Sequence, residues 1–143
     1  VVEQAYVQIL LARSIPAFNL QEKSSVESND IIYQTVSYIA KHFKEEMSLE
    51  KMARDMGVSK FTLSRVFSGT FHRNFNQYLN EQRLNYVCVH LECTDKSITD
   101  ISMDAGFESQ RTFNRAFRER YKMTPREYRN LYREKFVLQN EII

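Results

Sequence analysis

The sequence contains few of the residues that break or reverse a chain. Its 143 residues include only 3 Gly and 2 Pro, and few segments alternate apolar and polar residues. Because turn formers and a two-residue period are typical of β-sheets, their scarcity predicts an almost wholly helical chain. The N-terminal apolar stretch is interrupted by Glu3, Gln4 and Arg13, which excludes a membrane span there and suits no signal peptide.

Cysteine and histidine are also scarce. The 2 cysteines, Cys88 and Cys93, are too few for the disulfide framework of a small secreted protein, which favours a reducing compartment. Together with His90 they would fall on different faces of a helix, which disfavours a zinc site. The other histidines, His42 and His72, are scattered, and no Gly-rich phosphate loop or Ser/His/Asp order suggests an enzyme. We therefore expect no catalysis, no metal and no cofactor.

The net charge of +2 hides a local excess of positive charge. Between residues 111 and 129 there are seven basic residues and two acidic ones, Glu119 and Glu127. The basic residues are Arg111, Arg115, Arg118, Arg120, Lys122, Arg126 and Arg129. Such a cluster is either a surface that faces phosphates or simply a solvated helix face, and charge alone does not separate the two.

The first thirty residues differ in character from the rest. Apolar residues at helical spacing precede Pro16, namely Val2, Ala5, Tyr6, Ile9 and Leu10, and a polar run follows from Asn19 to Asp30. We expect residues 1–18 to be the helical tail of a missing N-terminal domain or, alternatively, a partner-binding helix. Residues 19–29 are then a linker.

From residue 30 onward the sequence predicts a string of short helices. Apolar residues recur at helical spacing from Ile31 to Phe43, and polar caps mark the later helix starts. Thr124-Pro125-Arg126-Glu127 is the most complete of these starts, with a cap, a proline at the first position and a glutamate at the third. The other predicted caps are Ser48, Ser59, Asn74, Ser97 and Ser109. We predict a domain over residues 30–130 and a C-terminal tail over residues 131–143.

A unit of about fifty residues occurs twice. Ser48-Leu49-x-x-Met52-Ala53-x-x-x-Gly57-Val58 matches Ser97-Ile98-x-x-Ile101-Ser102-x-x-x-Gly106-Phe107 at an offset of 49. After one inserted residue the offset is 50, and the matching pairs are Leu63/Phe113, Arg65/Arg115, Phe67/Phe117, Phe71/Tyr121 and Tyr78/Tyr128. A small residue four before a glycine permits a tight turn between two crossing helices. The repeat predicts an all-α fold of about seven helices, with two helix-turn-helix subdomains joined by a long linker helix.

The helix after each glycine has one apolar and one polar face. On a helical wheel the inward residues of the first copy are Leu63, Val66, Phe67 and Thr70, and those of the second are Phe113, Ala116 and Phe117. The outward or flanking residues of the first copy are Lys60, Phe61, Ser64, Arg65 and Ser68, and those of the second are Gln110, Arg111, Asn114, Arg115 and Arg118. Arg, Gln, Asn and Ser pair with base edges in the major groove, so both helices are predicted to read DNA.

Two of these positions have an alternative interpretation. Phe61 either packs on thymine methyls or sugars, or folds back onto the core. Arg115 either contacts a guanine or pairs with Glu119 four residues later. The linker helix, from roughly Phe75 to Glu92, would be ~27 Å long. Successive major-groove segments lie ~34 Å apart, so one chain could place a reading helix in each of them.

These motifs resemble the AraC/XylS family of bacterial transcription regulators over about residues 30–130. The resemblance is strongest in the second copy, in Ile98-x-x-Ile101-x-x-x-x-Gly106-Phe107, Phe113-x-Arg115-x-Phe117-Arg118 and Thr124-Pro125-x-x-Tyr128-Arg129. It implies a seven-helix DNA-binding domain that usually follows a ligand-sensing or dimerisation domain. The sequence departs from the family where His72 and Lys122 replace the glycines that end the reading helices, and where Ser102 and Val87 replace alanines. The two cysteines cannot supply the four-cysteine zinc module of the branch that repairs alkylated DNA.

The resemblance assigns DNA contacts residue by residue. Base contacts fall on Phe61, Ser64, Arg65, Gln110, Arg111, Asn114 and Arg115. We expect contacts with the DNA backbone from Ser59, Lys60, Ser109, Arg118, Arg126 and Arg129.

The sequence thus predicts a sequence-specific DNA-binding transcription regulator that inserts two recognition helices into successive major-groove segments. The expected partners are double-stranded DNA, RNA polymerase and a second copy through the missing N-terminal domain, in the cytoplasm at the nucleoid and without a membrane. The alternative is a helical protein-interaction module that does not bind DNA. Acidic or neutral outer faces on both reading helices would favour that alternative, and arginine-rich faces disfavour it.

Overall fold

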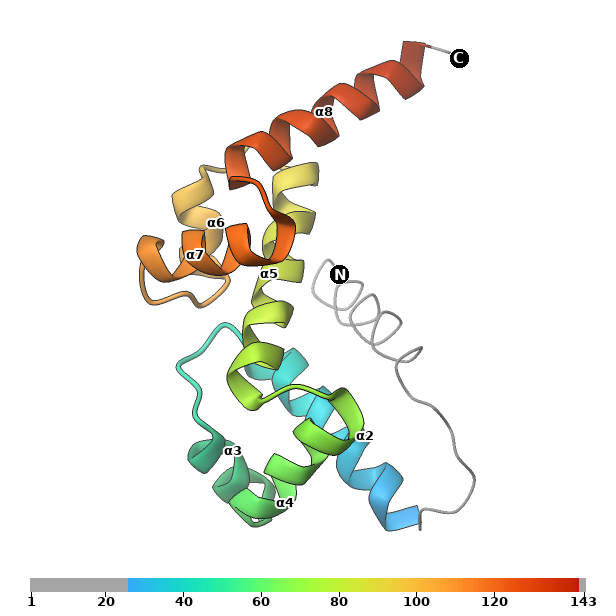
Figure 1. The fold of residues 1–143 in the computed structure, drawn as a ribbon, viewed down its shortest axis with the longest axis vertical. Coiled ribbons are helices and arrows are strands. Elements are labelled where there is room, and N and C mark those ends of the chain that lie inside the picture. The colour runs from blue at the N-terminus through green and yellow to red at the C-terminus, as the bar shows by residue number, and fades with distance from the viewer. Residues whose placement is uncertain (1–25, 142–143) are drawn as a thin grey trace. The chain divides into compact units, whose positions relative to one another are not determined.

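The computed structural model describes residues 26–141, and this range is helical with no strand (Figure 1). The helices are α2 (Val26–His42), α3 (Leu49–Met56), α4 (Lys60–Val66), the π-helical segment η2 (Phe67–Phe71), α5 (Phe75–Cys93), α6 (Ile98–Asp104), α7 (Gln110–Tyr121) and α8 (Pro125–Glu141). The predicted all-α class with seven α-helices is confirmed. The chain divides after Gln82 into two compact units, unit 1 before that point and unit 2 from Arg83, so that α5 contributes to both.

Serine hydroxyls cap four of the helices at the predicted positions. Ser48 Oγ accepts a hydrogen bond from the Lys51 N–H at 3.1 Å, and Ser97 Oγ accepts one from the Asp100 N–H at 3.0 Å. Ser59 and Ser109 do the same for α4 and α7, through the N–H groups of Thr62 (3.0 Å) and Thr112 (3.2 Å). Each bond satisfies one of the backbone donors that the first turn of a helix leaves unpaired. The caps therefore set where both helix-turn-helix motifs begin.

Reciprocal capping boxes begin α5 and α8, again at matching positions of the repeat. Asn74 Oδ1 accepts from the Gln77 N–H at 2.9 Å, while Gln77 Oε1 accepts from the Asn74 N–H at 3.0 Å. Fifty residues later, Glu127 Oε2 accepts from the Thr124 N–H at 2.7 Å and Thr124 Oγ1 accepts from the Glu127 N–H at 3.2 Å. Each box holds two otherwise unpaired donors at the start of its helix.

The core of each unit is built on a phenylalanine at the same repeat position. In unit 1, Phe67 is 1% exposed, and its ring lies 5.8 Å from Phe71, 5.6 Å from Phe75 and 5.6 Å from Tyr78. In unit 2, Phe117 is fully buried. Its ring lies 5.7 Å from Phe113, 4.7 Å from Tyr121 and 5.6 Å from Tyr128. These separations are those of favourable edge-to-face and tilted ring pairs. The inward phase predicted for both reading helices is confirmed.

Four residues with positive φ shape the turns. Gly57 (φ +67°) and Gly106 (φ +96°) stand between the two helices of each motif, as the repeat predicted. The next N–H, of Val58 or Phe107, then reaches back five residues to the carbonyl of Ala53 (3.0 Å) or Ser102 (3.2 Å). His72 (φ +53°) and Lys122 (φ +58°) end the two reading helices. Both residues therefore adopt the left-handed backbone conformation that favours glycine.

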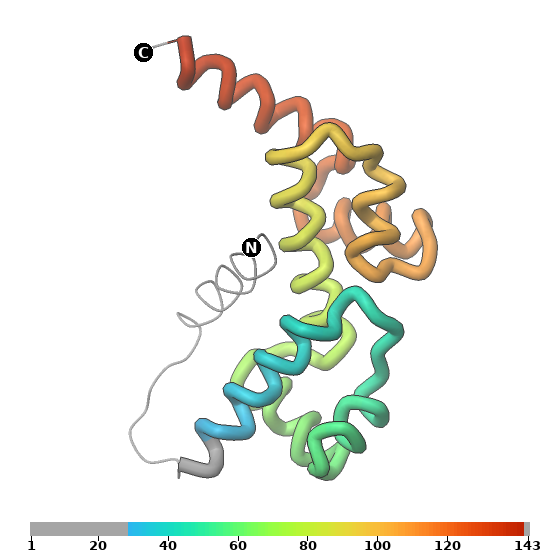
Figure 2. The backbone as a smooth tube through the Cα atoms, turned by 180° about the vertical axis from the view of Figure 1, so that it is seen from behind, coloured from blue at the N-terminus to red at the C-terminus, as the bar shows by residue number. Residues whose placement is uncertain are grey.

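Some elements differ in extent from the sequence expectation. α2 begins at Val26, inside the predicted linker, and α8 continues to Glu141 through the predicted tail. Residues 131–141 are all exposed, and Figure 2 shows this end of α8 extending past the rest of unit 2. The expected helical segment 1–18 lies outside the described residues. Among the described helices, none combines the length and the apolar character that a bilayer crossing requires.

Candidate nucleic-acid interface

The outer face of α4 carries the residues predicted to read DNA in unit 1. Ser64 and Arg65 are exposed, and Phe61 is 78% exposed, so its ring points outward and does not fold back onto the core. Leu63 and Val66, on the opposite face, are buried. The face therefore combines one apolar ring, one hydroxyl and one guanidinium, which together suit a groove with both methyl groups and hydrogen-bond acceptors.

The first and last turns of this helix have further contacts within unit 1. The Lys60 ammonium pairs with Glu50 of α3, and this hydrogen bond holds the pKa of the exposed Glu50 carboxyl below its usual value. Ser68 Oγ donates to the main-chain carbonyl of Ser64 at 3.0 Å. Beyond Val66 the helix continues as the π-helical segment, whereas α7 remains α-helical over the matching positions. The sequence repeat gave no sign of this difference.

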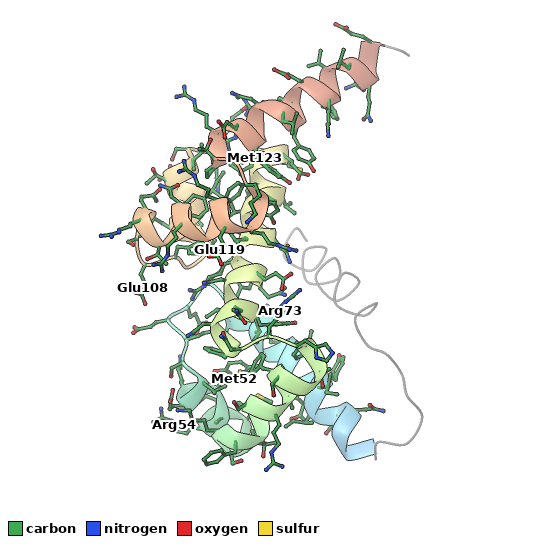
Figure 3. The ribbon with its side chains drawn as sticks, in the orientation of Figure 1. Met52, Arg54, Arg73, Glu108, Glu119 and Met123 are labelled. Atoms are coloured by element: carbon green, nitrogen blue, oxygen red, sulfur yellow. The ribbon has the colours of Figure 1, made fainter. Side chains whose placement is uncertain are left out.

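The outer face of α7 is more strongly basic. Arg111, Asn114, Arg115 and Arg118 are exposed, while Phe113 and Phe117 are buried behind them. Within the described part of the chain, Arg115 forms no ion pair with Glu119 or with any other carboxylate. Figure 3 labels Glu119 on α7 and Glu108 in the segment just before this helix. The guanidinium groups on this face are thus available to a ligand.

Gln110 differs from the other predicted readers of α7. It is half-buried, and its Nε2 donates a hydrogen bond to Ser102 Oγ on α6 at 2.5 Å. Ser102 is fully buried, and its hydroxyl donates to the main-chain carbonyl of Thr99 at 2.8 Å. The sequence had marked Ser102 as the small residue before the turn and as a departure from the family's alanine, and not as a partner of Gln110. The repeat contains a signal for this role, because Ser102 has a hydroxyl where the matching residue of the first copy, Ala53, has none.

The two basic residues predicted on α8 lie in different environments. Arg126 is exposed in the first turn of the helix. Arg129 is half-buried, and its Nε and Nη2 donate to the main-chain carbonyls of Leu91 (3.3 Å) and Lys96 (2.7 Å). Burial lowers the pKa of the Arg129 guanidinium, and the nearby Arg133 adds to this effect. Because these donors already bind main-chain carbonyls at and just beyond the end of α5, we assign Arg129 to the fold of unit 2. We leave it out of the proposed DNA contacts.

Two further polar side chains in the described range hold helices together rather than facing a ligand. The Tyr38 hydroxyl of α2 donates to Asp55 of α3 at 2.6 Å, and burial with this hydrogen bond raises the pKa of Tyr38 to about 12. The Tyr128 hydroxyl of α8 donates to Glu92 of α5 at 2.7 Å, and burial together with this hydrogen bond raises the pKa of Tyr128. Both bonds fix a helix that supports a recognition helix.

Comparison with known proteins finds transcription regulators among the relatives. Residues 52–131 match a family described as a helix-turn-helix domain. The chain is 35% identical over 100 residues to the regulatory protein SoxS of Escherichia coli strain K12, a match that covers 70% of this chain and 94% of SoxS. A transcriptional regulator of Chromobacterium violaceum, with an AraC-type DNA-binding domain, has a similar structure at a TM-score of 0.68 and 30% identity, over 76% of this chain and 96% of that one.

A DNA complex is also among the similar structures. The DNA-binding domain of AdpA, a global transcriptional factor solved with a target DNA, matches at a TM-score of 0.68 and 26% identity, over 73% of this chain and 94% of that domain. The chain belongs to the AraC/XylS family of transcription regulators. Its two units are accordingly the two helix-turn-helix subdomains of an AraC-type domain. Within each unit we use the name recognition helix for the second helix of the motif, α4 or α7, which the sequence predicts to read DNA.

Proposed function

We propose that this chain is a sequence-specific DNA-binding transcription regulator that reads duplex DNA with α4 and α7. The observation that carries the proposal is the paired outward arginine, Arg65 in one helix and Arg115 in the other, each exposed at the centre of a face whose opposite side is buried. A guanidinium in that position can donate two parallel hydrogen bonds to the O6 and N7 atoms of guanine. The DNA complex of the similar AdpA domain supports the same use of the fold.

The proposed contacts fall into two groups. Base contacts are proposed for Phe61, Ser64, Arg65, Gln110, Arg111, Asn114 and Arg115. Backbone contacts are proposed for Lys60, Arg118 and Arg126, and for the free N–H groups at the helix starts that follow Ser59 and Ser109. The Ser59 and Ser109 hydroxyls already cap their helices, so the phosphates would meet main-chain donors there. Lys60 would have to leave Glu50 or share its ammonium with it.

Salt dependence of binding to random duplex DNA tests the proposal. A protein that neutralises several phosphates releases their counterions, so log K should fall with log salt with a slope steeper than about −3. Fluorescence anisotropy of a labelled random duplex between low and moderate salt measures this slope. A flat response would rule out phosphate contacts and favour the alternative, a helical module that binds protein. Selection from random duplexes then tests whether the protein prefers a sequence.

The partners beyond DNA rest on the family alone. We propose that the regulator contacts RNA polymerase when it is bound near a promoter, and that a domain preceding this sequence mediates dimerisation. Both ideas assign a role to parts of the full protein outside α4 and α7. Neither changes the expectation that a single copy of this chain presents both recognition helices to one duplex.

A further inference from the structure

The recognition helix of unit 2 is tied at its first residue to the helix that precedes it. Gln110 Nε2 donates to Ser102 Oγ at 2.5 Å, and Ser102 Oγ donates to the Thr99 carbonyl at 2.8 Å. The chain of hydrogen bonds runs from α7 into α6 and ends on a main-chain oxygen. Ser102 is fully buried, so no solvent competes for its hydroxyl.

The direction of these hydrogen bonds fixes the orientation of the Gln110 amide. A serine hydroxyl has one proton to donate, and here that proton goes to the Thr99 carbonyl. Ser102 Oγ can then only accept, so the Gln110 group that faces it must be the NH2 and not the carbonyl oxygen. Within the described residues Gln110 Oε1 has no hydrogen-bond partner, which leaves an oriented acceptor in the first turn of the recognition helix.

Unit 1 carries a different tie at the matching positions. Lys60, which aligns with Gln110, pairs with Glu50, which aligns with Thr99. Ala53 aligns with Ser102 and has no hydroxyl. Both units therefore hold the first residue of the recognition helix against the preceding helix. In unit 2 this residue is Gln110, and a buried hydroxyl fixes which end of its amide faces inward.

We propose that Ser102 is a positioning residue for DNA specificity, which holds Gln110 so that its carbonyl oxygen meets an amino group on a base edge. In the major groove these amino groups are N6 of adenine and N4 of cytosine, whereas thymine and guanine present O4 or O6 acceptors. An amide held the other way round would favour the opposite bases. This inference rests on the proposed function, and it names the base chemistry that one residue of the site selects.

The first experiment locates the base that Gln110 reads. Selection from random duplexes with the wild-type chain defines the preferred site, and the same selection with Gln110→Ala shows which position loses its preference. We expect adenine or cytosine at that position. A wild-type chain that selects no sequence would overturn the proposed function and this inference with it. A Gln110→Ala chain that keeps the full wild-type preference, or a preferred thymine or guanine at that position, overturns the inference alone.

The second experiment removes the hydroxyl and leaves the amide in place. Anisotropy titrations with all four base pairs at the Gln110 position give the ratio of affinities between the preferred and the next base pair. In Ser102→Ala this ratio should fall about fivefold, because the amide can then flip and its rotamer is no longer held. In a Gln110→Ala background, Ser102→Ala should not change the ratio further. A Ser102→Ala ratio equal to that of the wild type would show that the hydroxyl serves packing only.

Two controls separate positioning from a general loss of structure. Alanine already occupies the matching position, Ala53, so Ser102→Ala should fold, and its thermal transition should confirm this. Thr35→Val removes another fully buried hydroxyl, one that donates to the Ile31 carbonyl at 2.7 Å, and should leave the ratio unchanged. If Thr35→Val lowers the ratio as much as Ser102→Ala does, the effect is not specific to Gln110.

The amino group itself can be tested on the DNA. Replacing the preferred base with an analogue that lacks only the exocyclic amino group should weaken binding of the wild-type chain and should not affect Gln110→Ala. Equal weakening of both proteins would mean that another residue meets this amino group, which contradicts the assignment.

Discussion

At the ends of the two recognition helices, His72 and Lys122 adopt a backbone conformation that favours glycine. Their φ values of +53° and +58° cost an L-residue roughly 1–2 kcal/mol relative to glycine. We therefore expect His72→Gly and Lys122→Gly each to raise the free energy of unfolding by about 1 kcal/mol, after the greater freedom of glycine in the unfolded chain is subtracted. Urea denaturation midpoints measure the change.

Two glycines of unit 1 provide controls, because alanine should lower the unfolding free energy at one of them and raise it at the other. Gly57 has φ +67°, so Gly57→Ala should lower the unfolding free energy by about 1–2 kcal/mol, although a Cβ there meets nothing within 4 Å. Gly69 lies in the helical segment η2, and a Cβ added there also meets nothing within 4 Å. Gly69→Ala should therefore raise the unfolding free energy by about 0.5–1 kcal/mol. A loss of stability in His72→Gly or Lys122→Gly would show that these side chains make a contact that outweighs the strain.

The capping box of α8 predicts a pH dependence of stability. The hydrogen bonds from the Thr124 backbone N–H and side chain hold the pKa of the exposed Glu127 carboxyl below its usual value. A carboxyl whose pKa is lower in the folded than in the unfolded protein stabilises the fold above its unfolded pKa of about 4.3. This stabilisation is lost as the pH falls through the folded pKa. We expect Glu127→Gln to be less stable than the wild type at neutral pH, and the difference to shrink as the pH falls below the unfolded pKa and through the folded pKa.

The matching capping box at the start of α5 allows the opposite substitution, from glutamine to glutamate. Gln77 makes the same pair of hydrogen bonds with Asn74 but carries no charge, so Gln77→Glu should introduce a new loss of stability below about pH 4.3. Denaturation midpoints at a series of pH values follow both variants. A wild-type-minus-Glu127→Gln difference that stays constant from pH 7 to pH 3 would mean that the carboxylate charge adds nothing to the cap.

At the scale of the elements, each recognition helix is anchored by one phenylalanine. Phe67 and Phe117 are buried among three aromatic rings each, so truncation to alanine leaves a cavity that rigid neighbours cannot fill. We expect Phe67→Ala and Phe117→Ala each to lower the unfolding free energy by about 3–5 kcal/mol. Phe61→Ala, on the exposed face of α4, should change it by less than about 0.5 kcal/mol. A loss below about 1 kcal/mol in either core variant would contradict the packing of that helix.

The helix starts that the sequence predicted correctly are those that carry a local chemical signal. Ser48, Ser59, Ser97 and Ser109 accept hydrogen bonds from a backbone N–H three residues later, an interaction that a short sequence window contains in full. The repeat also predicted which face of each helix is buried, because the two copies have apolar residues at the same positions. Start points without such a signal were missed, as at Val26, where α2 begins within a polar run.

The parts of the site that the sequence could not predict depend on contacts between distant residues. The helix start at Thr124 placed Arg129 on a helix, but its hydrogen bonds to the carbonyls of Leu91 and Lys96 join residues more than thirty positions apart. The Gln110–Ser102 bond likewise crosses the turn of the motif. The helical wheel placed Gln110 on the flank of its helix, and the basic cluster with the family resemblance named Arg129. Neither kind of signal shows the partners of a side chain, so both residues were predicted to contact DNA.

At the scale of the whole molecule, the two units should read different parts of one site. Arg65 and Arg115 occupy matching positions on separate recognition helices, and both are exposed. We expect Arg65→Ala and Arg115→Ala each to lower affinity for the preferred site by about 1–3 kcal/mol and to relax base preference at one position. Because unit 1 offers Phe61 and Ser64 where unit 2 offers Arg111 and Asn114, the two relaxed positions should lie towards opposite ends of the site.

Arg126→Ala separates base reading from charge in the same assay. Arg126 lies outside the recognition helices, in the first turn of α8, so its loss should weaken binding to preferred and random duplexes alike and leave base preference intact. Selection from random duplexes with each of the three variants provides the comparison. If Arg65→Ala and Arg115→Ala both retain the wild-type preference, these arginines contact phosphates and the bases are read by other residues. If both relax the same position, the two units do not divide the site between them.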